Sequence, residues 1–265
     1  MTTITGIQLD RLTALLNQCR YGQSVHYVEE AESTQNMAAS MVRDGKGDGL
    51  LVLAEKQTAG RGRFGRPWFS PPGAGIYMSL VLNPRIPHKY MSHLTIVASV
   101  ALCRVLRRIT AIDIRLKWPN DLYANGRKLS GILIESCSDD SWKLIMGVGI
   151  TVNVPQDEFP DWLQEKATSL MAASGQAYER EEIIASFLHE LESMIDLYEN
   201  AGFAVFRTLW ETHAWQPDSP IKLMTPQGPI VGKPVSIDEN GALLVQLEDG
   251  KVTTVYSGEI TNTIS

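Results

Sequence analysis

Cysteine is scarce in this 265-residue sequence: Cys19, Cys103 and Cys137 lie far apart and form no CxxC pair. This pattern argues against a disulfide framework and against any obvious zinc site, and it is typical of a reducing compartment. A basic N-terminal stretch followed by an apolar core is missing, and no apolar run approaches the roughly 20 residues that span a bilayer. We therefore expect a cytoplasmic protein that does not enter the membrane.

An excess of positive charge is missing as well. The formal net charge is -6 at pH 7, whereas general nucleic-acid binders are usually basic. Hydrophobic residues (44%) and charged residues (20%) occur in proportions that are ordinary for a globular chain, which argues against a disordered or fibrous protein. The sequence also contains no internal repeat and no low-complexity segment.

The hydrophobic pattern predicts a domain that mixes helices and strands. Helices are expected at residues 9–16, 33–42, 91–109 and 181–203, the last extended by a second helix through 213. Strands are expected at residues 25–30, 50–54, 76–82, 112–118, 129–136 and 142–148. Ser33 is expected to cap its helix through the side-chain hydroxyl. Asn125-Gly126 predicts a tight hairpin turn.

Composition changes near residues 216–218. Beyond that point, turn signals at Gln227-Gly228, Glu239-Asn240-Gly241 and Glu248-Asp249-Gly250 separate short apolar runs. Regularly spaced turns between short strands are typical of a small β-barrel. We therefore expect an α/β catalytic domain at residues 1–216 and an SH3-like β-barrel at residues 217–265.

The segment Gly60–Trp68 (GRGRFGRPW) is the most informative stretch of the sequence. Three glycines let the backbone approach a ligand closely, and three arginines place charge beside the exposed amides. Such a loop suits a phosphate or a carboxylate. A solvated basic loop is the alternative, and the interleaved glycines followed by a tryptophan disfavour it.

Gly60, Gly62 and Gly65 also satisfy the G-x-G-x-x-G dinucleotide pattern, which requires a helix directly afterwards and an acidic residue about 20 positions later. Proline at 67, 71 and 72 prevents that helix, and residues 80–85 contain no acid. The phosphate-loop pattern ending in Gly-Lys-Ser/Thr is absent too. An NAD-binding fold is therefore disfavoured.

A second polar cluster follows at residues 117–121 (KWPND) and 127–135 (RKLSGILIE). Lysines, an amide and a carboxylate stand here at the ends of strands and in a turn, where a rigid sheet often presents functional groups. Each alone is more often a solvated surface charge. Together with the glycine–arginine loop they are typical of a nucleotide and metal site.

Five segments in this order resemble the signature of biotin protein ligases: 32–34 (EST), 57–63 (QTAGRGR), 117–121, 128–135 and 147–150 (GVGI). The resemblance runs from about residue 25 through the C-terminal domain. It implies a mixed-sheet catalytic domain related to class II aminoacyl-tRNA synthetases, followed by an SH3-like domain. Two positions depart from the pattern: Gln35 replaces a common Asn, and Thr151 replaces the usual Asn, so no nucleotide contact is assigned to Thr151.

The resemblance implies that biotin is activated by ATP to biotinyl-5′-AMP and then joined to a lysine of a biotin carboxyl carrier protein. The implied biotin-binding residues are Ser33, Thr34, Gln35, Gln57, Gly60, Arg61, Gly62, Arg63, Lys128 and Gly131. Those implied for ATP and the adenylate are Arg63, Arg66, Trp68, Lys117, Asn120 and Lys128. Arg63, Arg66 and Lys128 would be catalytic, because two anionic reactants require fixed positive charge. Mg²⁺ is implied as a cofactor, with Asp121 as its ligand.

A lipoate or octanoate ligase of the same fold is the nearest alternative, and the full glycine–arginine loop followed by KWPND favours biotin. A biotin-responsive repressor is disfavoured, because about 24 residues precede the first expected strand and a helix-turn-helix module needs more, so we expect no DNA binding. His88 and His93 have no motif context and are expected to be structural or exposed. The oligomeric state stays open, a homodimer included.

Overall fold

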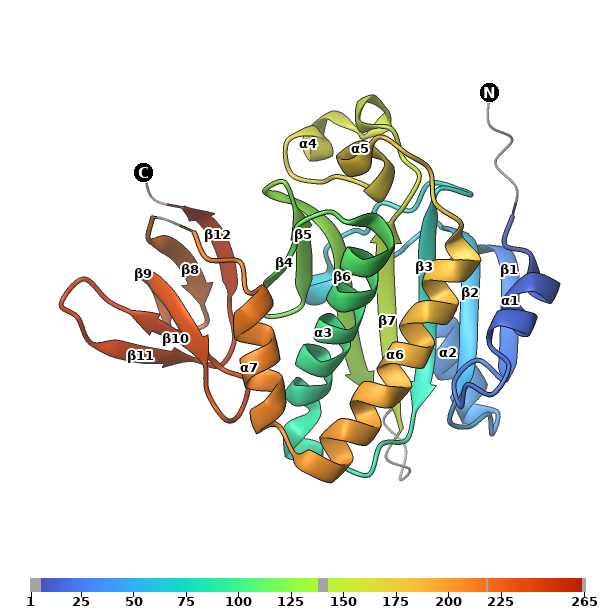
Figure 1. Ribbon diagram of the computed structural model, residues 1–265, viewed down its shortest axis with the longest axis horizontal. Coiled ribbons are helices and arrows are strands. Elements are labelled where there is room, and N and C mark those ends of the chain that lie inside the picture. The colour runs from blue at the N-terminus through green and yellow to red at the C-terminus, as the bar shows by residue number, and fades with distance from the viewer. Residues whose placement is uncertain (1–5, 138–142, 218, 264–265) are drawn as a thin grey trace.

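The computed structural model describes residues 6–137, 143–217 and 219–263. Its larger sheet has seven strands in the order β1-β2-β3-β7-β6-β5-β4 (Figure 1). The strands are β1 Ser24–Ala31, β2 Leu50–Gln57, β3 Gly75–Leu82, β4 Ile114–Lys117, β5 Asp121–Ala124, β6 Arg127–Ser136 and β7 Leu144–Thr151. β1 and β2 are parallel and the other pairs are antiparallel. The expected mixed sheet is thus confirmed.

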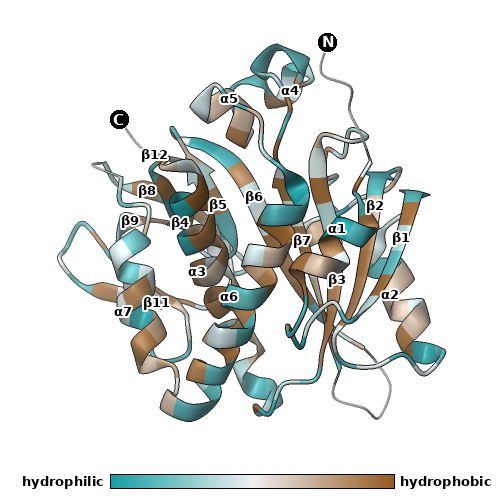
Figure 2. Ribbon diagram, turned by 45° about the vertical axis from the view of Figure 1, so that its right-hand side comes forward, coloured by the Kyte–Doolittle hydropathy of each residue, from teal (hydrophilic) through white to brown (hydrophobic). Residues whose placement is uncertain are grey.

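Helices cover both faces of this sheet (Figure 1). On one face lie α1 Leu9–Leu15, α3 Met91–Thr110, α6 Arg180–Ala201 and α7 Ala204–His213, and on the other lies α2 Thr34–Arg43. α3 is apolar around most of its circumference because it is buried between the sheet and α6. Figure 2 shows the same hydrophobic character along the central strands β2, β3 and β7. Short helices α4 Asp161–Gln164 and α5 Leu170–Ser174 occupy a stretch for which the sequence predicted no element.

The start of α2 differs from expectation. Ser33 stands at the N-cap position with extended backbone, but its side chain makes no capping hydrogen bond. The backbone N–H of Thr34 instead donates to Gln57 Oε1 over 2.9 Å. The expected Ser33 cap is therefore wrong, because a residue of β2 takes up the first unpaired amide of the helix.

The hairpin between β5 and β6 is confirmed. Asn125 and Gly126 have φ angles of +51° and +76°. A two-residue turn with both central residues at positive φ matches the twist of the flanking strands. β4, at Ile114–Lys117, is shorter than the strand expected at residues 112–118. β7 begins at Leu144, and its expected start at residue 142 lies outside the described residues.

The smaller sheet is antiparallel throughout, in the order β11-β10-β9-β8-β12. Its strands are β8 Ile221–Thr225, β9 Gly228–Ile237, β10 Leu243–Gln246, β11 Val252–Val255 and β12 Glu259–Thr263. The small C-terminal β-domain is confirmed. The boundary expected between residues 216 and 217 lies in the connection from α7 to β8 and stays a prediction. Trp118 Nε1 donates to the carbonyl oxygen of Gly241 over 3.0 Å and joins this domain to the larger one.

No helix within the described ranges is both long and apolar enough to cross a membrane.

Candidate active site

One face of the large sheet has a row of glycines, where no side chain covers the backbone. Gly147 and Gly149 stand two residues apart on β7, and Gly131 of β6 pairs with Gly149. The same row continues through Asp121 of β5 to Lys117 of β4. Residues that alternate with the β7 glycines point to the opposite face and join the core under α3. This row of glycines, named here the glycine floor, therefore faces α2 and the glycine–arginine loop.

Two side chains lie directly on the glycine floor. A Cβ added to Gly149 would lie 2.5 Å from the indole ring of Trp68, and one added to Gly147 would lie 2.6 Å from Gln35 Oε1. Real Cβ atoms do not approach other heavy atoms so closely. Glycine is therefore required at both positions to seat Trp68 and Gln35.

A cluster of buried amide and hydroxyl groups adjoins the floor. Gln57 Oε1 accepts hydrogen bonds from the N–H and the hydroxyl of Thr34 at 2.9 and 3.1 Å. Ser79 Oγ lies 2.9 Å from Thr34 Oγ1 and 3.1 Å from Gln35 Oε1. Gln57 Nε2 donates to Ser70 Oγ over 3.3 Å. The cluster offers donors and acceptors together, as recognition of a cyclic urea or an amide requires.

Ser33 is buried beside this cluster, and Gly60 is held against it. Ser33 is only 3% exposed. A Cβ on Gly60 would lie 2.8 Å from Gln57 Nε2. Ser79 and Ser70 were not among the residues predicted from the sequence. The signal for Ser79 was a single serine within the largely apolar run of β3, where it is fully buried.

The glycine–arginine loop closes on itself through backbone hydrogen bonds. The N–H of Trp68 donates to Gly60 O, and the N–H of Gly62 donates to Arg66 O, each over 2.8 Å. Phe64 at the tip has a φ of +58° and is 69% exposed. The guanidinium of Arg61 pairs with both carboxylate oxygens of Glu135 at 2.7 and 2.9 Å.

Lysine and carboxylate groups meet at the far end of the floor. Lys128 Nζ lies 2.7 Å from Asp121 Oδ1 and 5.4 Å from the centroid of the Trp68 ring. Lys117 Nζ lies 4.5 Å and 5.1 Å from the ring centroids of Tyr123 and Trp215. Burial lowers the pKa of Lys117; the charge of Asp121 opposes this effect and that of Lys128 adds to it. The carboxylate is thus held between cations.

Two loop arginines reach the C-terminal domain. Arg63 Nη1 lies 3.5 Å from Asn120 Oδ1 and donates to Gly258 O over 3.4 Å. Arg66 forms an ion pair through both of its terminal nitrogens with Glu259 of β12. Burial lowers the pKa of Arg63, but a guanidinium stays charged at any physiological pH. No pattern in the sequence pointed to Gly258 or Glu259, because both belong to the C-terminal domain.

Asn120 is held firmly by its neighbours. Its Nδ2 donates to Ile132 O over 2.7 Å, and its own carbonyl accepts from the Ile132 N–H over 3.0 Å. The side-chain oxygen is thereby turned toward Arg63. The sequence-predicted residues thus form two adjoining groups. One holds Ser33, Thr34, Gln35, Gln57 and Gly60, and the other holds Arg63, Trp68, Asn120, Asp121, Lys128 and Gly131. Arg61, Arg66 and Lys117 lie at the margins, engaged with other partners.

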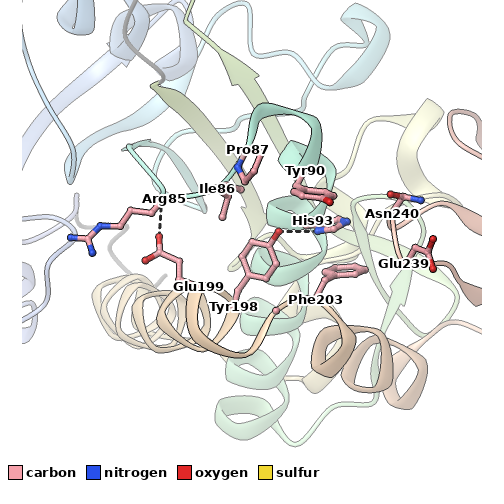
Figure 3. Close-up of a pocket in the computed structure, with 11 residues that line it drawn as sticks. Arg85, Ile86, Pro87, Tyr90, His93, Tyr198, Glu199, Phe203, Glu239 and Asn240 are labelled. Carbon is pink, nitrogen blue, oxygen red and sulfur yellow. Dashed lines mark hydrogen bonds between the residues drawn. The ribbon is translucent and has the colours of Figure 1, made fainter.

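A separate hollow of about 520 Å³ lies where the α6–α7 junction meets the β9–β10 turn. Figure 3 shows Tyr90, His93, Tyr198 and Phe203 along its wall. His93 Nδ1 lies 2.9 Å from Tyr198 OH, and its ring stacks on Phe203 at 3.8 Å between centroids. None of the predicted site residues lines this hollow. His93 is structural, as expected, and His88 is exposed.

The comparisons with known proteins agree with this architecture. Residues 27–153 match the Biotin/lipoate A/B protein ligase family, and residues 218–261 match the Biotin protein ligase C terminal domain. The chain is 38% identical over 241 residues to "Bifunctional ligase/repressor BirA" of Bacillus spizizenii, covering 90% of this chain and 74% of that protein. It is 33% identical over 224 residues to "Biotin--[acetyl-CoA-carboxylase] ligase" of Paracoccus denitrificans, covering 82% of this chain and 92% of that protein.

The solved structures agree too. The biotin protein ligase from Aquifex aeolicus, in complex with biotin and ATP, superposes with a TM-score of 0.80 at 32% identity, over 90% of this chain and 98% of that one. The mixed sheet, with the cations beside its glycine floor, and the family match place the protein among the biotin and lipoate protein ligases. The C-terminal match and the named relatives narrow this class further: the chain belongs to the biotin protein ligase family.

Proposed function

We propose that this chain activates biotin with ATP to biotinyl-5′-AMP and transfers biotin to one lysine of a biotin carboxyl carrier protein. The observation that carries the proposal is the junction of two chemically different regions on one sheet face. A buried amide and hydroxyl cluster adjoins a glycine floor bordered by Arg63 and Lys128. The Aquifex aeolicus relative was solved with biotin and ATP.

The ureido ring of biotin would bind in the amide and hydroxyl cluster. Its carbonyl accepts hydrogen bonds and its two N–H groups donate them, so Ser33, Thr34 and Gln57 can satisfy both kinds of group. Gln35 would have a different role, because its amide already has partners. Gln35 Nε2 donates to Ile145 O over 3.0 Å, and Gln35 Oε1 accepts from Ser79. Gln35 would keep the cluster in position, while Gly60, Arg61 and Gly62 close over the ligand with their backbone.

In the adenylation step, a biotin carboxylate oxygen attacks the α-phosphorus of ATP, and the bond to the bridging oxygen of the pyrophosphate breaks. Both reactants are anionic, so fixed cations lower the barrier by binding the charge that develops on the phosphoryl oxygens. Arg63 and Lys128 would supply this charge directly, and Arg66 and Lys117 would supply it from the margins. Asn120 would orient the phosphate, and Trp68 on the floor would stack on the adenylate.

Mg²⁺ fits this site only as a companion of the nucleotide. Asp121 offers one carboxylate, paired with Lys128. Mg²⁺ is commonly held by one or two carboxylates together with substrate phosphates. Asp121 would therefore hold the ion jointly with phosphate oxygens, and the ion would neutralise part of the triphosphate charge.

In the transfer step, the neutral amine of the carrier lysine attacks the carbonyl carbon of the mixed anhydride. An amide bond forms, the bond to the AMP oxygen breaks, and the amine releases a proton. The mixed anhydride is open to hydrolysis, so a closed loop that excludes water protects it. The position of Trp68 of the Gly60–Trp68 loop against Gly149 supports this role.

The decisive experiment is exchange of labelled pyrophosphate into ATP. We expect exchange with biotin and none above background with lipoate, followed by labelling of a carrier domain only when its acceptor lysine is present. Exchange with lipoate but not with biotin would assign the chain to lipoate or octanoate activation instead.

A further inference from the structure

Three side chains of metal-ligand type meet where α1 contacts α6, on the edge of the domain away from the glycine floor. Cys19 follows α1, and His189 and Glu192 stand three residues apart on α6. The thiol sulfur, a ring nitrogen and a carboxylate oxygen all lie within 4.8 Å of one another. Residues i and i+3 of a helix share one face, so α6 presents both side chains to Cys19.

Two of these residues, His189 and Glu192, also form hydrogen bonds with other groups. His189 Nε2 lies 3.0 Å from the carbonyl oxygen of Leu15. A carbonyl only accepts, so Nε2 carries the proton of the neutral ring and Nδ1 has the free lone pair. Metal-ligating histidines usually donate their second nitrogen in this way. Glu192 Oε2 accepts the N–H of Arg20 over 3.0 Å, which leaves the other carboxylate oxygen available.

The buried thiol of Cys19 lies next to a side chain that is exposed to solvent. Cys19 is 1% exposed, whereas His189 lies at the surface. A divalent ion that binds the sulfur replaces the proton of the thiol.

We propose that Cys19, His189 and Glu192 form a zinc site, with a water molecule as fourth ligand. Thiolate, imidazole and carboxylate are the ligands that Zn²⁺ takes in tetrahedral sites, whereas Mg²⁺ and Ca²⁺ prefer oxygen alone. Zinc lies about 2.3 Å from sulfur and about 2.0 Å from nitrogen, which places neighbouring ligand atoms roughly 3.5 Å apart. Side-chain rotations that bring the three ligand atoms from within 4.8 Å of one another to about 3.5 Å close the cluster around the ion. Binding releases one thiol proton and ties the end of α1 to α6.

Cobalt titration tests the site without reference to catalysis. Co²⁺ bound by a thiolate has a sulfur-to-metal charge-transfer band in the near ultraviolet. The wild-type chain should develop this band with one equivalent of Co²⁺ and lose it when Zn²⁺ is added. Cys19→Ser should abolish the band, and Cys137→Ser, the matched control, should keep it.

His189→Gln separates a metal ligand from a packing residue. Glutamine keeps a donor for the Leu15 carbonyl and loses the free ring nitrogen, and the position is exposed, so the fold should survive. We expect the affinity for Co²⁺ and Zn²⁺ to fall at least about 100-fold, since loss of an outer-shell partner alone weakens metal binding 10- to 100-fold. Zn²⁺ should raise the Tm of the wild type and not of this variant. An unchanged band in Cys19→Ser, unchanged affinity in His189→Gln or no band in the wild type would each overturn the proposal.

Discussion

Arg66, in the loop between β2 and β3, forms an ion pair through both terminal nitrogens with Glu259 on β12, the last strand of the C-terminal domain. The two residues are 193 positions apart in the chain. The loop that we propose to cover the adenylate is thus fastened to the second domain. Arg66 cannot give its full charge to a phosphate while Glu259 neutralises it.

This relationship predicts that Glu259→Gln releases Arg66 for the nucleotide. Partly exposed ion pairs contribute about 0.2–1 kcal/mol, so KM for ATP in pyrophosphate exchange should fall roughly 1.4- to fivefold. The Tm should change little for the same reason. Glu248→Gln, at an exposed turn of the same domain, should leave KM for ATP unchanged. A higher KM in Glu259→Gln would show that the ion pair supports ATP binding and does not compete with it.

The glycine floor predicts a sharp effect at Gly149. In Gly149→Ala the new methyl group lies 2.5 Å from the Trp68 ring, so the indole must move. Stacking of a base on an aromatic side chain contributes about 1–3 kcal/mol, and ATP should therefore bind roughly 5- to 160-fold more weakly, as measured by calorimetry. Gly47→Ala, where a Cβ meets nothing within 4 Å, is the matched control and should bind ATP normally. Normal ATP affinity in Gly149→Ala would remove Trp68 from the adenylate site.

Lys128 predicts a difference between the two chemical steps. Removal of one preorganised donor at a developing charge lowers the rate about 10²- to 10³-fold, and we expect this loss in pyrophosphate exchange by Lys128→Ala. Transfer from supplied biotinyl-5′-AMP to the carrier should suffer less, because no charge then develops on the α-phosphate. Lys222→Ala, an exposed lysine of β8, should behave as wild type. Exchange within twofold of wild type in Lys128→Ala would make this residue a solvated lysine.

His93 predicts a loss of stability as the pH falls. Burial lowers the pKa of His93 below its ordinary value of 6.5, an effect that the carbonyl of Glu239 and the charge of Asp238 only partly offset. The unfolded chain therefore binds more protons than the folded chain, and the free energy of unfolding decreases as the pH falls below about 6.5. The rings of Tyr90, Tyr198 and Phe203 enclose His93. They carry no negative charge that would stabilise the protonated imidazole.

Urea unfolding at pH 7.5 and pH 5.5 measures this effect. His93→Phe keeps a ring between Tyr90 and Phe203, and it should lose less stability over the interval than the wild type. Burial also lowers the pKa of His213, near the opposite end of α3. His213→Gln should remove its own share of the pH dependence, and the two effects should add because the sites are distant. An unchanged pH dependence in His93→Phe would contradict the prediction.

Local order in this protein was readable from the sequence. The apolar run at residues 50–54 predicted a buried strand, which the structure confirms as β2, and Asn125-Gly126 predicted a turn that the structure also confirms. The GRGRFGRPW loop and the KWPND segment predicted a ligand site, which stays a proposal. These features depend on neighbours within a few residues, because backbone preference and side-chain alternation are set by local sterics.

Contacts between distant segments required the tertiary structure. Ser79 meets Thr34 and Gln35 across 44 or 45 residues. Glu259 contacts Arg66 from the other domain. Cys19, near the start of the catalytic domain's sequence, meets His189 and Glu192, near its end. Strand register and domain packing decide which of many possible pairs meet, and both depend on burial of the whole core, which no short window of sequence contains. The sequence therefore determined which chemical groups are present, and the packing of the sheet and helices decided which of them share a site.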